Sequence, residues 1–245
     1  FLAMEREYGS VMRATMAAAR NNDQSNGDGS GSGARYGLFA APADGFSSLI
    51  AALETRLRDS GRVEIHFETP VRSLTPPVGD NAAWSLVLDK NVSRVRTFDQ
   101  VLLTTPAWTA AKLLEDCSDA ALIQDLSGIE YASSAIVLSA HRMDDFTHPL
   151  DAFGVVVPAI ENRKVLAVSF TSRKFPDRAP QGYVLLRTFV GGAMQPELFD
   201  ASDADIISMV QHELKSLLGM QANPKFTIVS RYERAMPQYH VGHLD

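Results

Sequence analysis

The sequence predicts an α+β protein in which a mixed or antiparallel sheet packs against helices. Four apolar runs rich in Val, Leu, Ile and Phe follow one another within residues 131–192, each bounded by Pro, Gly, Asp or Asn. Amphipathic helical patterns stand on either side of them, over residues 46–57 and 200–219. The short connections favour an antiparallel meander, and stretches such as VVV favour strands that are covered on both faces.

Composition excludes several classes of protein. The 245 residues carry 23 Lys and Arg against 29 Asp and Glu, so a net charge of −6 argues against nucleic-acid binding. Cys117 is the single cysteine, which excludes an internal disulfide and fits a reducing compartment. Its neighbours Glu115 and Asp116 disfavour a reactive thiolate. No apolar run is long enough to span a bilayer. The absence of a start methionine and of a signal peptide predicts a piece of a longer protein.

The first 35 residues contain a helix and a loop. Apolar residues at helical spacing predict a helix over residues 1–20 despite Gly9, with one apolar face formed by Met4, Tyr8, Val11, Met12 and Met16. Residues 21–35 carry no apolar side chain before Ala34 and are expected to form a flexible loop. Their GDGSGSG stretch is not a phosphate-binding loop, because no strand precedes it and no helix follows at once.

The next segment mixes helices and strands. Helix 46–57 is expected to be capped by Ser47 and to end at residues 59–61. Further elements follow in order: a strand over 63–74 bent at Pro70, a hairpin of 84–89 and 94–98 with Lys90-Asn91 near its turn, a buried strand over 99–106, and helices over 107–114 and 119–126.

The four apolar runs form the predicted sheet, at residues 131–140, 153–158, 165–170 and 183–192. Such a sheet can wall an apolar pocket, since alternate side chains line one continuous surface, although a plain core sheet is the other interpretation. The helix over 200–219 has Ser202 at its N-cap and Gly219 at its end, and a last strand covers 226–233.

Catalytic side chains do not cluster in the sequence. His240 and His243 have a spacing that metals use, but no Cys or acidic cluster joins them, so no metal site is expected. His66 is expected to be a hydrogen-bonded surface or core histidine. A large apolar sheet without an acid–base set indicates either passive binding or chemistry supplied by a cofactor.

The order of motifs resembles the protoporphyrinogen oxidase family, within the flavin-dependent amine-oxidase superfamily. The resemblance covers nearly the whole chain except the glycine-rich loop. It rests on QVLLTTPAWTAAKLL, IEYASSAIVLSAHR, FGVVVP, VLAVSFTSRKFPDRAP, LLRTFVGG and PQYHVGH, of which FGVVVP and PQYHVGH are the most specific. It implies partial strands of an FAD-binding Rossmann-like domain over residues 36–116 and a substrate domain over 117–245. The family's G-x-G-x-x-G turn for the FAD pyrophosphate and its second glycine-rich motif lie outside residues 1–245.

The resemblance also implies roles for individual residues. Val71 would lie against the adenine of FAD, and Thr104, Thr105 and Pro106 would border the cofactor. No catalytic side chain is implied. The substrate-binding residues would be Phe153, Gly154, Val156, Ser169 and Phe189. Ser169 falls where the family is usually apolar and Phe189 where it often has Met, and Gly154 would let a flat macrocycle approach the backbone.

The implied reaction is the oxidation of protoporphyrinogen IX by FAD in three hydride transfers, with O2 as the acceptor and hydrogen peroxide released. The tetrapyrrole and O2 are the implied partners, and FAD belongs to the parent protein rather than to these 245 residues alone. The resemblance allows a homodimer and a cytoplasmic protein held peripherally at the inner face of the membrane. Two alternatives stay open: an amine oxidase or carotenoid desaturase, and a non-catalytic module that binds an apolar ligand or partner. Coproporphyrinogen differs from protoporphyrinogen only in peripheral carboxylates, so the sequence leaves both as substrates.

Overall fold

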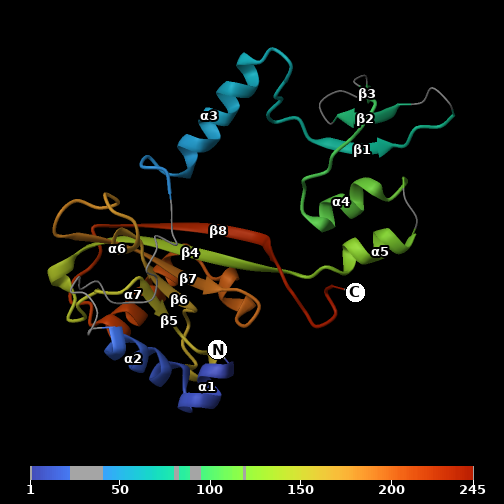
Figure 1. The fold of residues 1–245 in the computed structure, drawn as a ribbon. Helices are drawn as coiled ribbons and strands as arrows, with labels where there is room; N and C mark the ends of the chain where they lie inside the picture. The colour runs from blue at the N-terminus through green and yellow to red at the C-terminus, as the bar shows by residue number, and fades with distance from the viewer. Residues whose placement is uncertain (1, 23–40, 80–82, 89–94, 118–119, 245) are drawn as a thin grey trace. The chain divides into compact units, whose positions relative to one another are not determined.

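A computed structural model of the chain describes residues 2–22, 41–79, 83–88, 95–117 and 120–244. The chain divides into two compact units, Phe1–Ala40 and Ala41–Asp245. Figure 1 labels the helices and strands along the chain. The predicted loop over 21–35 lies outside the described residues except at its first two positions, which the structure places in a helix.

The described part of the first unit, residues 2–22, contains two helices rather than the one that was predicted. Helix α1 covers Leu2–Tyr8 and helix α2 covers Val11–Asn22. The break falls at Gly9, whose φ of 68° is left-handed and cannot continue a right-handed helix. The expectation that the helix would run through this glycine is therefore wrong.

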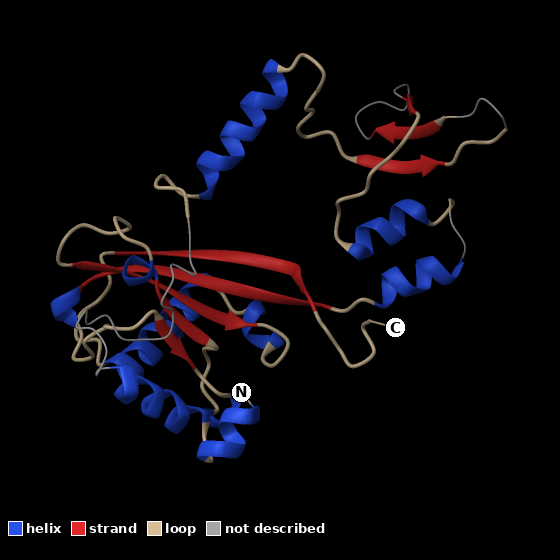
Figure 2. Cartoon of the chain, in the orientation of Figure 1, coloured by secondary structure: helices blue, strands red, loops and turns tan. Residues whose placement is uncertain are grey.

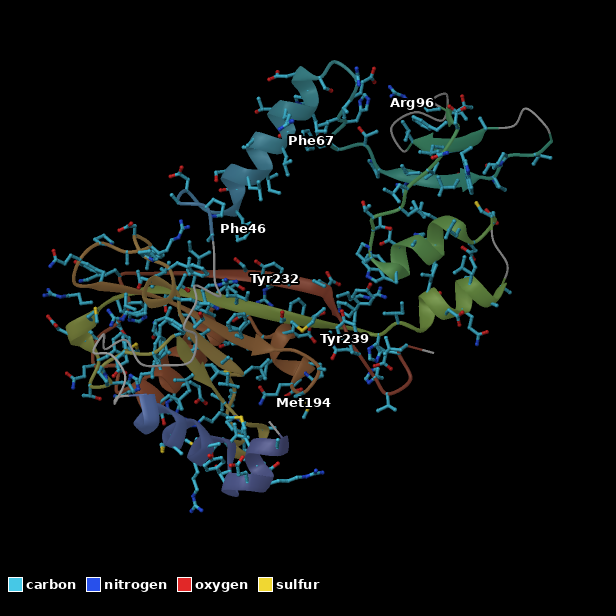
Figure 3. All side chains as sticks on the ribbon, viewed as in Figure 1. Phe46, Phe67, Arg96, Met194, Tyr232 and Tyr239 are labelled. Atoms are coloured by element: carbon cyan, nitrogen blue, oxygen red, sulfur yellow. The ribbon has the colours of Figure 1, made fainter. Side chains whose placement is uncertain are left out.

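Helix α3 (Phe46–Asp59) opens the second unit and ends where the sequence predicts, before Ser60 and Gly61. Its N-cap is Gly45 and no side chain caps it, so the predicted cap at Ser47 is wrong. Its apolar face is exposed in the described structure, with side chains that are 44–62% accessible: Phe46, Leu49, Ile50, Leu53 and Leu57. Figure 3 shows Phe46 at the start of this helix.

A three-stranded antiparallel sheet follows, in the order β1-β2-β3. Its strands are Val71–Thr75, Trp84–Leu88 and Val95–Phe98, which confirms the hairpin; the predicted turn at Lys90-Asn91 lies outside the described residues. Helices α4 (Ala107–Leu114) and α5 (Ala120–Gly128) come next, close to their predicted bounds.

Two strand predictions in this region are wrong. Residues 63–70 and 99–106 have no strand structure, and Phe67 and Leu102 are 68% and 87% exposed. A strand needs a hydrogen-bonded neighbour. The described part of the chain provides none for either segment. Only the stretch after Pro70 pairs, as β1.

The main sheet has five antiparallel strands in the order β5-β6-β7-β4-β8. Strands β5, β6 and β7 form the predicted meander, but β4 pairs with β7 and β8 instead of β5 (Figure 2). The simple four-strand meander is therefore wrong, although the strands themselves are confirmed. They are β4 (Tyr131–Arg142), β5 (Gly154–Val156), β6 (Ala167–Phe170), β7 (Tyr183–Gly191) and β8 (Phe226–Pro237).

Helix α7 (Asp203–Leu218) covers one face of this sheet. The Ser202 hydroxyl accepts a hydrogen bond from the Asp205 amide (3.2 Å), and Gly219 ends the helix at a φ of 65°, as predicted. Helix α7 buries Ile206, Val210 and Leu214 in one core with β4, β6 and β7. Short helices complete the connections: η1 (Met143–Asp145), η2 (Ala159–Glu161), α6 (Thr171–Lys174) and η3 (Pro196–Asp200).

Burial alternates along the central strands, so the sheet has one covered face and one more open face. Along β7 the side chains from Val184 to Val190 are alternately buried and half-buried. Along β4, Ala135 and Val137 are fully buried, while Ile136 and Leu138 are not. The sequence predicts strands covered on both faces; in the described residues of β4 and β7 the second face is half-buried rather than buried.

Candidate binding site on the outer face of the sheet

The outer face is the face of the five-stranded sheet opposite the core that contains α7. Strand register defines it, because residues paired across antiparallel strands point to the same side. One row runs Gly154, Ser169, Arg187, Leu138 and Ile228, and the next runs Val156, Ala167, Phe189, Ile136 and Ser230. Most of these side chains are apolar or small, so the rows form a surface suited to a flat apolar ligand.

Four of the five predicted substrate residues share this outer face. Gly154 pairs with Ser169, and Val156 and Phe189 both pair with Ala167. The Val156 side chain is 80% exposed at the sheet edge. Phe153 precedes β5 and has no partner in the strand register, so the register assigns it to neither face; its side chain is 48% exposed and its carbonyl accepts from the Phe170 amide (2.9 Å).

Gly154 is required by the packing of β5 against β6, without any ligand. Its φ is +153°, and a Cβ at this position would collide with the Val168 carbonyl oxygen and approach the Ser169 Cα to 3.0 Å. The obstacle is the backbone of β6, which cannot move aside as a flexible side chain could. The close approach at Gly154 is therefore between β5 and β6, and the role of Gly154 toward a macrocycle stays a prediction.

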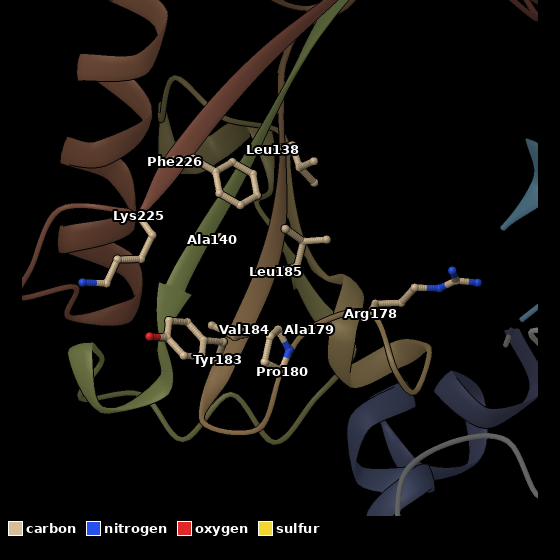
Figure 4. Close-up of a pocket in the computed structure, with 10 residues that line it drawn as sticks. All are labelled: Leu138, Ala140, Arg178, Ala179, Pro180, Tyr183, Val184, Leu185, Lys225 and Phe226. Atoms are coloured by element: carbon tan, nitrogen blue, oxygen red, sulfur yellow. The ribbon is translucent and has the colours of Figure 1, made fainter. Parts of the chain in front are cut away.

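An apolar cavity of about 330 Å3 opens at one end of the outer face (Figure 4). Its wall includes Leu138 and Ala140 from β4 and Leu185 from β7, closed by Pro180 and Phe226. Leu138 also belongs to the row that contains Ser169 and Arg187, so the cavity continues the outer face. Sequence reasoning missed this cavity, because its wall combines residues that only the pairing of β4 with β7 brings together.

The four predicted cofactor residues fall in two separate places. Thr104, Thr105 and Pro106 are exposed at the end of the unpaired segment that leads into α4. Val71 is the first residue of β1. No hydrogen bond joins Val71 to Thr104–Pro106 among the described residues, although α4, which directly follows Pro106, packs against β1.

Contacts of α4 connect the Thr104–Pro106 segment to the start of β4. The amide of Ala107, the first residue of α4, donates to the Tyr131 hydroxyl (3.0 Å). The guanidinium of Arg234 on β8 lies 4.5 Å from the centre of the Trp108 ring. Figure 3 marks Tyr232 and Tyr239, two further exposed aromatic residues on β8 and just after it. Thr104–Pro106 therefore lie next to the first residues of β4 in the main sheet.

Titratable groups elsewhere make no catalytic cluster in the described structure. Burial, followed by the charge of Asp116, raises the pKa of the Cys117 thiol, which donates to the Leu74 carbonyl (2.9 Å). His240 Nε2 lies 3.0 Å from Glu130, and His66 is exposed beside Glu64 and Arg96, as expected for ordinary surface histidines. Among the residues described, no group of His, Cys, Asp or Glu could hold a metal ion.

The described helices are too short or too polar to cross a membrane. Peripheral attachment and a homodimer therefore stay predictions, as does the division at residue 116 into a cofactor part and a substrate part.

Comparison with known proteins identifies this arrangement of helices and antiparallel sheets as an oxidoreductase fold. The chain belongs to the flavin containing amine oxidoreductase family, whose model matches residues 3–245. Within that family it is related to the protoporphyrinogen and coproporphyrinogen oxidases.

Two curated relatives illustrate the relationship. The chain is 30% identical to the coproporphyrinogen III oxidase of Staphylococcus aureus, over 86% of this chain and 44% of the relative. It is 29% identical to the mitochondrial protoporphyrinogen oxidase of Nicotiana tabacum, over 81% of this chain and 40% of the relative. The chain thus spans less than half the length of these two relatives.

A solved structure agrees with the fold. A crystal structure of a protein from Exiguobacterium sp. 255-15, which carries a provisional protoporphyrinogen oxidase assignment, has a TM-score of 0.72 and 26% identity. The match covers 99% of this chain and 47% of that one. A cyclohexylamine oxidase from Brevibacterium oxydans shares the fold at a TM-score of 0.56 and 15% identity.

Proposed function

We propose that the protein carrying this chain oxidises protoporphyrinogen IX to protoporphyrin IX with FAD as cofactor and O2 as electron acceptor, a step of haem biosynthesis. The observation that carries the proposal is the match to porphyrinogen oxidases over more than four-fifths of the chain. The outer face supports it independently, because its apolar rows and the adjoining cavity suit a flat, largely apolar macrocycle.

The residues of this chain fit only an edge of the cofactor. The exposed segment Thr104–Pro106 is accessible to a ligand and leads into α4, where the Ala107 amide already donates to the Tyr131 hydroxyl and the Thr109 amide to the Pro106 carbonyl. None of the described residues forms a glycine turn between a strand and a helix, the usual cradle for a pyrophosphate. When bound, FAD supplies the acceptor for hydride.

The proposed work of the outer face is orientation and exclusion of water. Phe189 and its row neighbours Ala167 and Ile136 offer a surface on which a macrocycle can lie flat. Holding the reacting carbon in a fixed orientation lowers the entropic part of the barrier and needs no acid or base from the protein. This suits a face on which the described residues include neither His nor a carboxylate.

Coproporphyrinogen III is the second candidate substrate. It is favoured by the Staphylococcus aureus relative and by a third relative, the coproporphyrinogen III oxidase of Propionibacterium freudenreichii, which is 33% identical over 84% of this chain.

The test is an oxidation assay on the full-length protein loaded with FAD. Protoporphyrinogen IX and coproporphyrinogen III are supplied separately, and porphyrin fluorescence and O2 consumption are followed together. We expect one of them to be oxidised with consumption of O2. Oxidation of neither substrate by a flavin-loaded, folded protein would contradict the proposal.

A matched pair of variants tests the site. Phe189→Ala removes the aromatic surface of the outer face and should lower kcat/KM by about 5- to 150-fold, since a stacked ring contributes on the order of 1–3 kcal/mol. Phe98→Ala removes a phenyl ring that is 43% exposed on β3 and should leave turnover unchanged. Equal effects of the two substitutions would place the substrate elsewhere.

A further inference from the structure

Arg187 is a cation in the interior of the outer face, where its cross-strand neighbours are uncharged; Arg178 and Lys225 lie at the end of the face, on the wall of the cavity. Arg187 lies between Ser169 on β6 and Leu138 on β4, and its guanidinium stands 5.6 Å from the centre of the Phe189 ring. The side chain is half-buried. Arg142, the other cation that register assigns to this face, stands at its edge and lies within 4.0 Å of Asp144.

The guanidinium of Arg187 has no anionic partner in the part of the chain that the structure describes. Neither an ion pair nor a hydrogen bond to a side chain is recorded for it. Its one recorded contact is the cation–π contact with the Phe189 ring, which supplies no anion. By contrast, the half-buried Arg163 is paired with Glu213 (2.9 Å). Removing a cation from water without an anion is costly. A guanidinium also presents five donors in a fork that fits a carboxylate.

We propose that Arg187 binds a peripheral carboxylate of the tetrapyrrole and thereby selects for acidic macrocycles; the proposal rests on the proposed function. A macrocycle lying on Phe189 and its row neighbours would bring its edge to the adjacent row, where Arg187 stands beside Ser169. The apolar rows then contact the ring system, and Arg187 fixes its rotation on the sheet. Arg187 is thus a specificity-determining residue rather than a catalytic one.

The test measures porphyrin binding, which is independent of turnover. The full-length, FAD-loaded protein is titrated with coproporphyrin III and with its uncharged tetramethyl ester, with quenching of porphyrin fluorescence as the signal. Arg187→Met should weaken binding of the acid about tenfold, or about 1.4 kcal/mol. Binding of the ester should not change. Arg187→Lys keeps the charge without the fork and should restore part of the loss.

Lys215→Met is the matched control. Lys215 is an exposed cation in the last turn of α7, the helix that packs against the opposite face, so its loss removes the same charge without touching the outer face. We expect this variant to bind both porphyrins as the wild type does.

Three results would overturn the proposal. Equal loss for acid and ester in Arg187→Met, or a lowered Tm that accounts for the loss, would make Arg187 a structural residue. Unchanged binding of the acid would remove its role outright. Failure of the wild-type protein to bind either porphyrin would overturn the proposed function as well. If the wild type binds porphyrin and only the Arg187 variants behave unexpectedly, the Arg187 proposal alone fails.

Discussion

Among single residues, His141 links burial most directly to a measurable property. It is fully buried on β4, its Nε2 lies 2.9 Å from the Ser139 hydroxyl, and its ring meets Phe146 edge-on. Burial lowers the pKa of His141 from 6.5 to about 4, although the charge of Asp145 acts in the opposite direction. The imidazole is therefore neutral in the folded protein at neutral pH.

This lowered pKa predicts a loss of stability in mild acid. The unfolded state binds more protons than the folded state between pH 6.5 and about 4, so the free energy of unfolding falls as the pH drops through that window. The expected loss is on the order of 1–3 kcal/mol. Urea unfolding of wild type and His141→Gln across this window measures it. An identical pH slope in both proteins would show that another group causes the loss.

Gly154 carries the second prediction at this scale. Gly154→Ala should destabilise the protein by about 1–3 kcal/mol, because the new Cβ would collide with the Val168 carbonyl and force β5 away from β6. Gly128→Ala is the control, since a Cβ there meets nothing within 4 Å. Urea midpoints of the two variants decide the matter. If Gly154→Ala kept full stability and lost only turnover, the glycine would instead serve a ligand.

Arg187 and Gly154 show which residue-level features the sequence predicts and which it does not. The run YVLLRTFVGG shows an arginine inside an apolar strand, but only the pairing of β7 with β4 and β6 reveals that its neighbours are uncharged. The sequence also shows that Gly154 is unusual in a strand. It does not show which neighbour is too close, because that neighbour is 14 residues further on in the chain.

Elements with strong local signals are predicted well, and elements that depend on partners are not. Helix α7 begins after Ser202 and ends before Gly219 as expected, because capping and chain reversal are local interactions. Residues 63–70 and 99–106 have equally good strand patterns but no pairing in the described structure. Helix α3 is similar, since its apolar face has the predicted spacing yet stays exposed.

The prediction at this scale concerns the anchor between α7 and the connection from β5 to β6. Glu213 on α7 is 7% exposed, and its carboxylate accepts from Arg163 Nη1 (2.9 Å) and from the Lys164 amide (3.3 Å). Glu213→Ala leaves both donors without this acceptor, so the free energy of unfolding should fall by about 1–3 kcal/mol. Chemical denaturation gives the value directly.

Asp144→Ala is the control for this anchor. Asp144 is 90% exposed and lies 4.0 Å from Arg142, a geometry in which an ion pair adds little. Similar losses in the two variants would mean that Glu213 contributes through general charge effects, and the anchor would then have no special role.

At the scale of the whole molecule, the described residues include the outer face that we propose as a binding wall and the few residues that we propose to contact the cofactor. The outer face and its cavity are complete enough to propose a ligand. The residues proposed to contact the cofactor, Thr104–Pro106 and Val71, lie in two segments of the chain, with no phosphate cradle among the described elements. The family could be recognised from short motifs, whereas the proposal that this chain reaches little of the cofactor site rests on its covering 44–47% of the relatives' length.

Because few of the proposed cofactor contacts lie in this chain, the 245-residue chain and the full-length protein should differ in their affinity for FAD. The 245-residue chain alone should bind FAD weakly or not at all. The contacts proposed for Val71 and Thr104–Pro106 cannot replace the hydrogen bonds that a glycine turn and a helix N-terminus give to a pyrophosphate. The full-length protein should purify yellow, with flavin close to one per chain. Flavin absorbance after desalting and equilibrium dialysis with added FAD measure both. Far-ultraviolet circular dichroism must show that the short chain is folded, since an unfolded chain would also fail to bind. A folded 245-residue chain that keeps FAD at one per chain would show that the contacts assigned to Val71 and Thr104–Pro106 are misplaced.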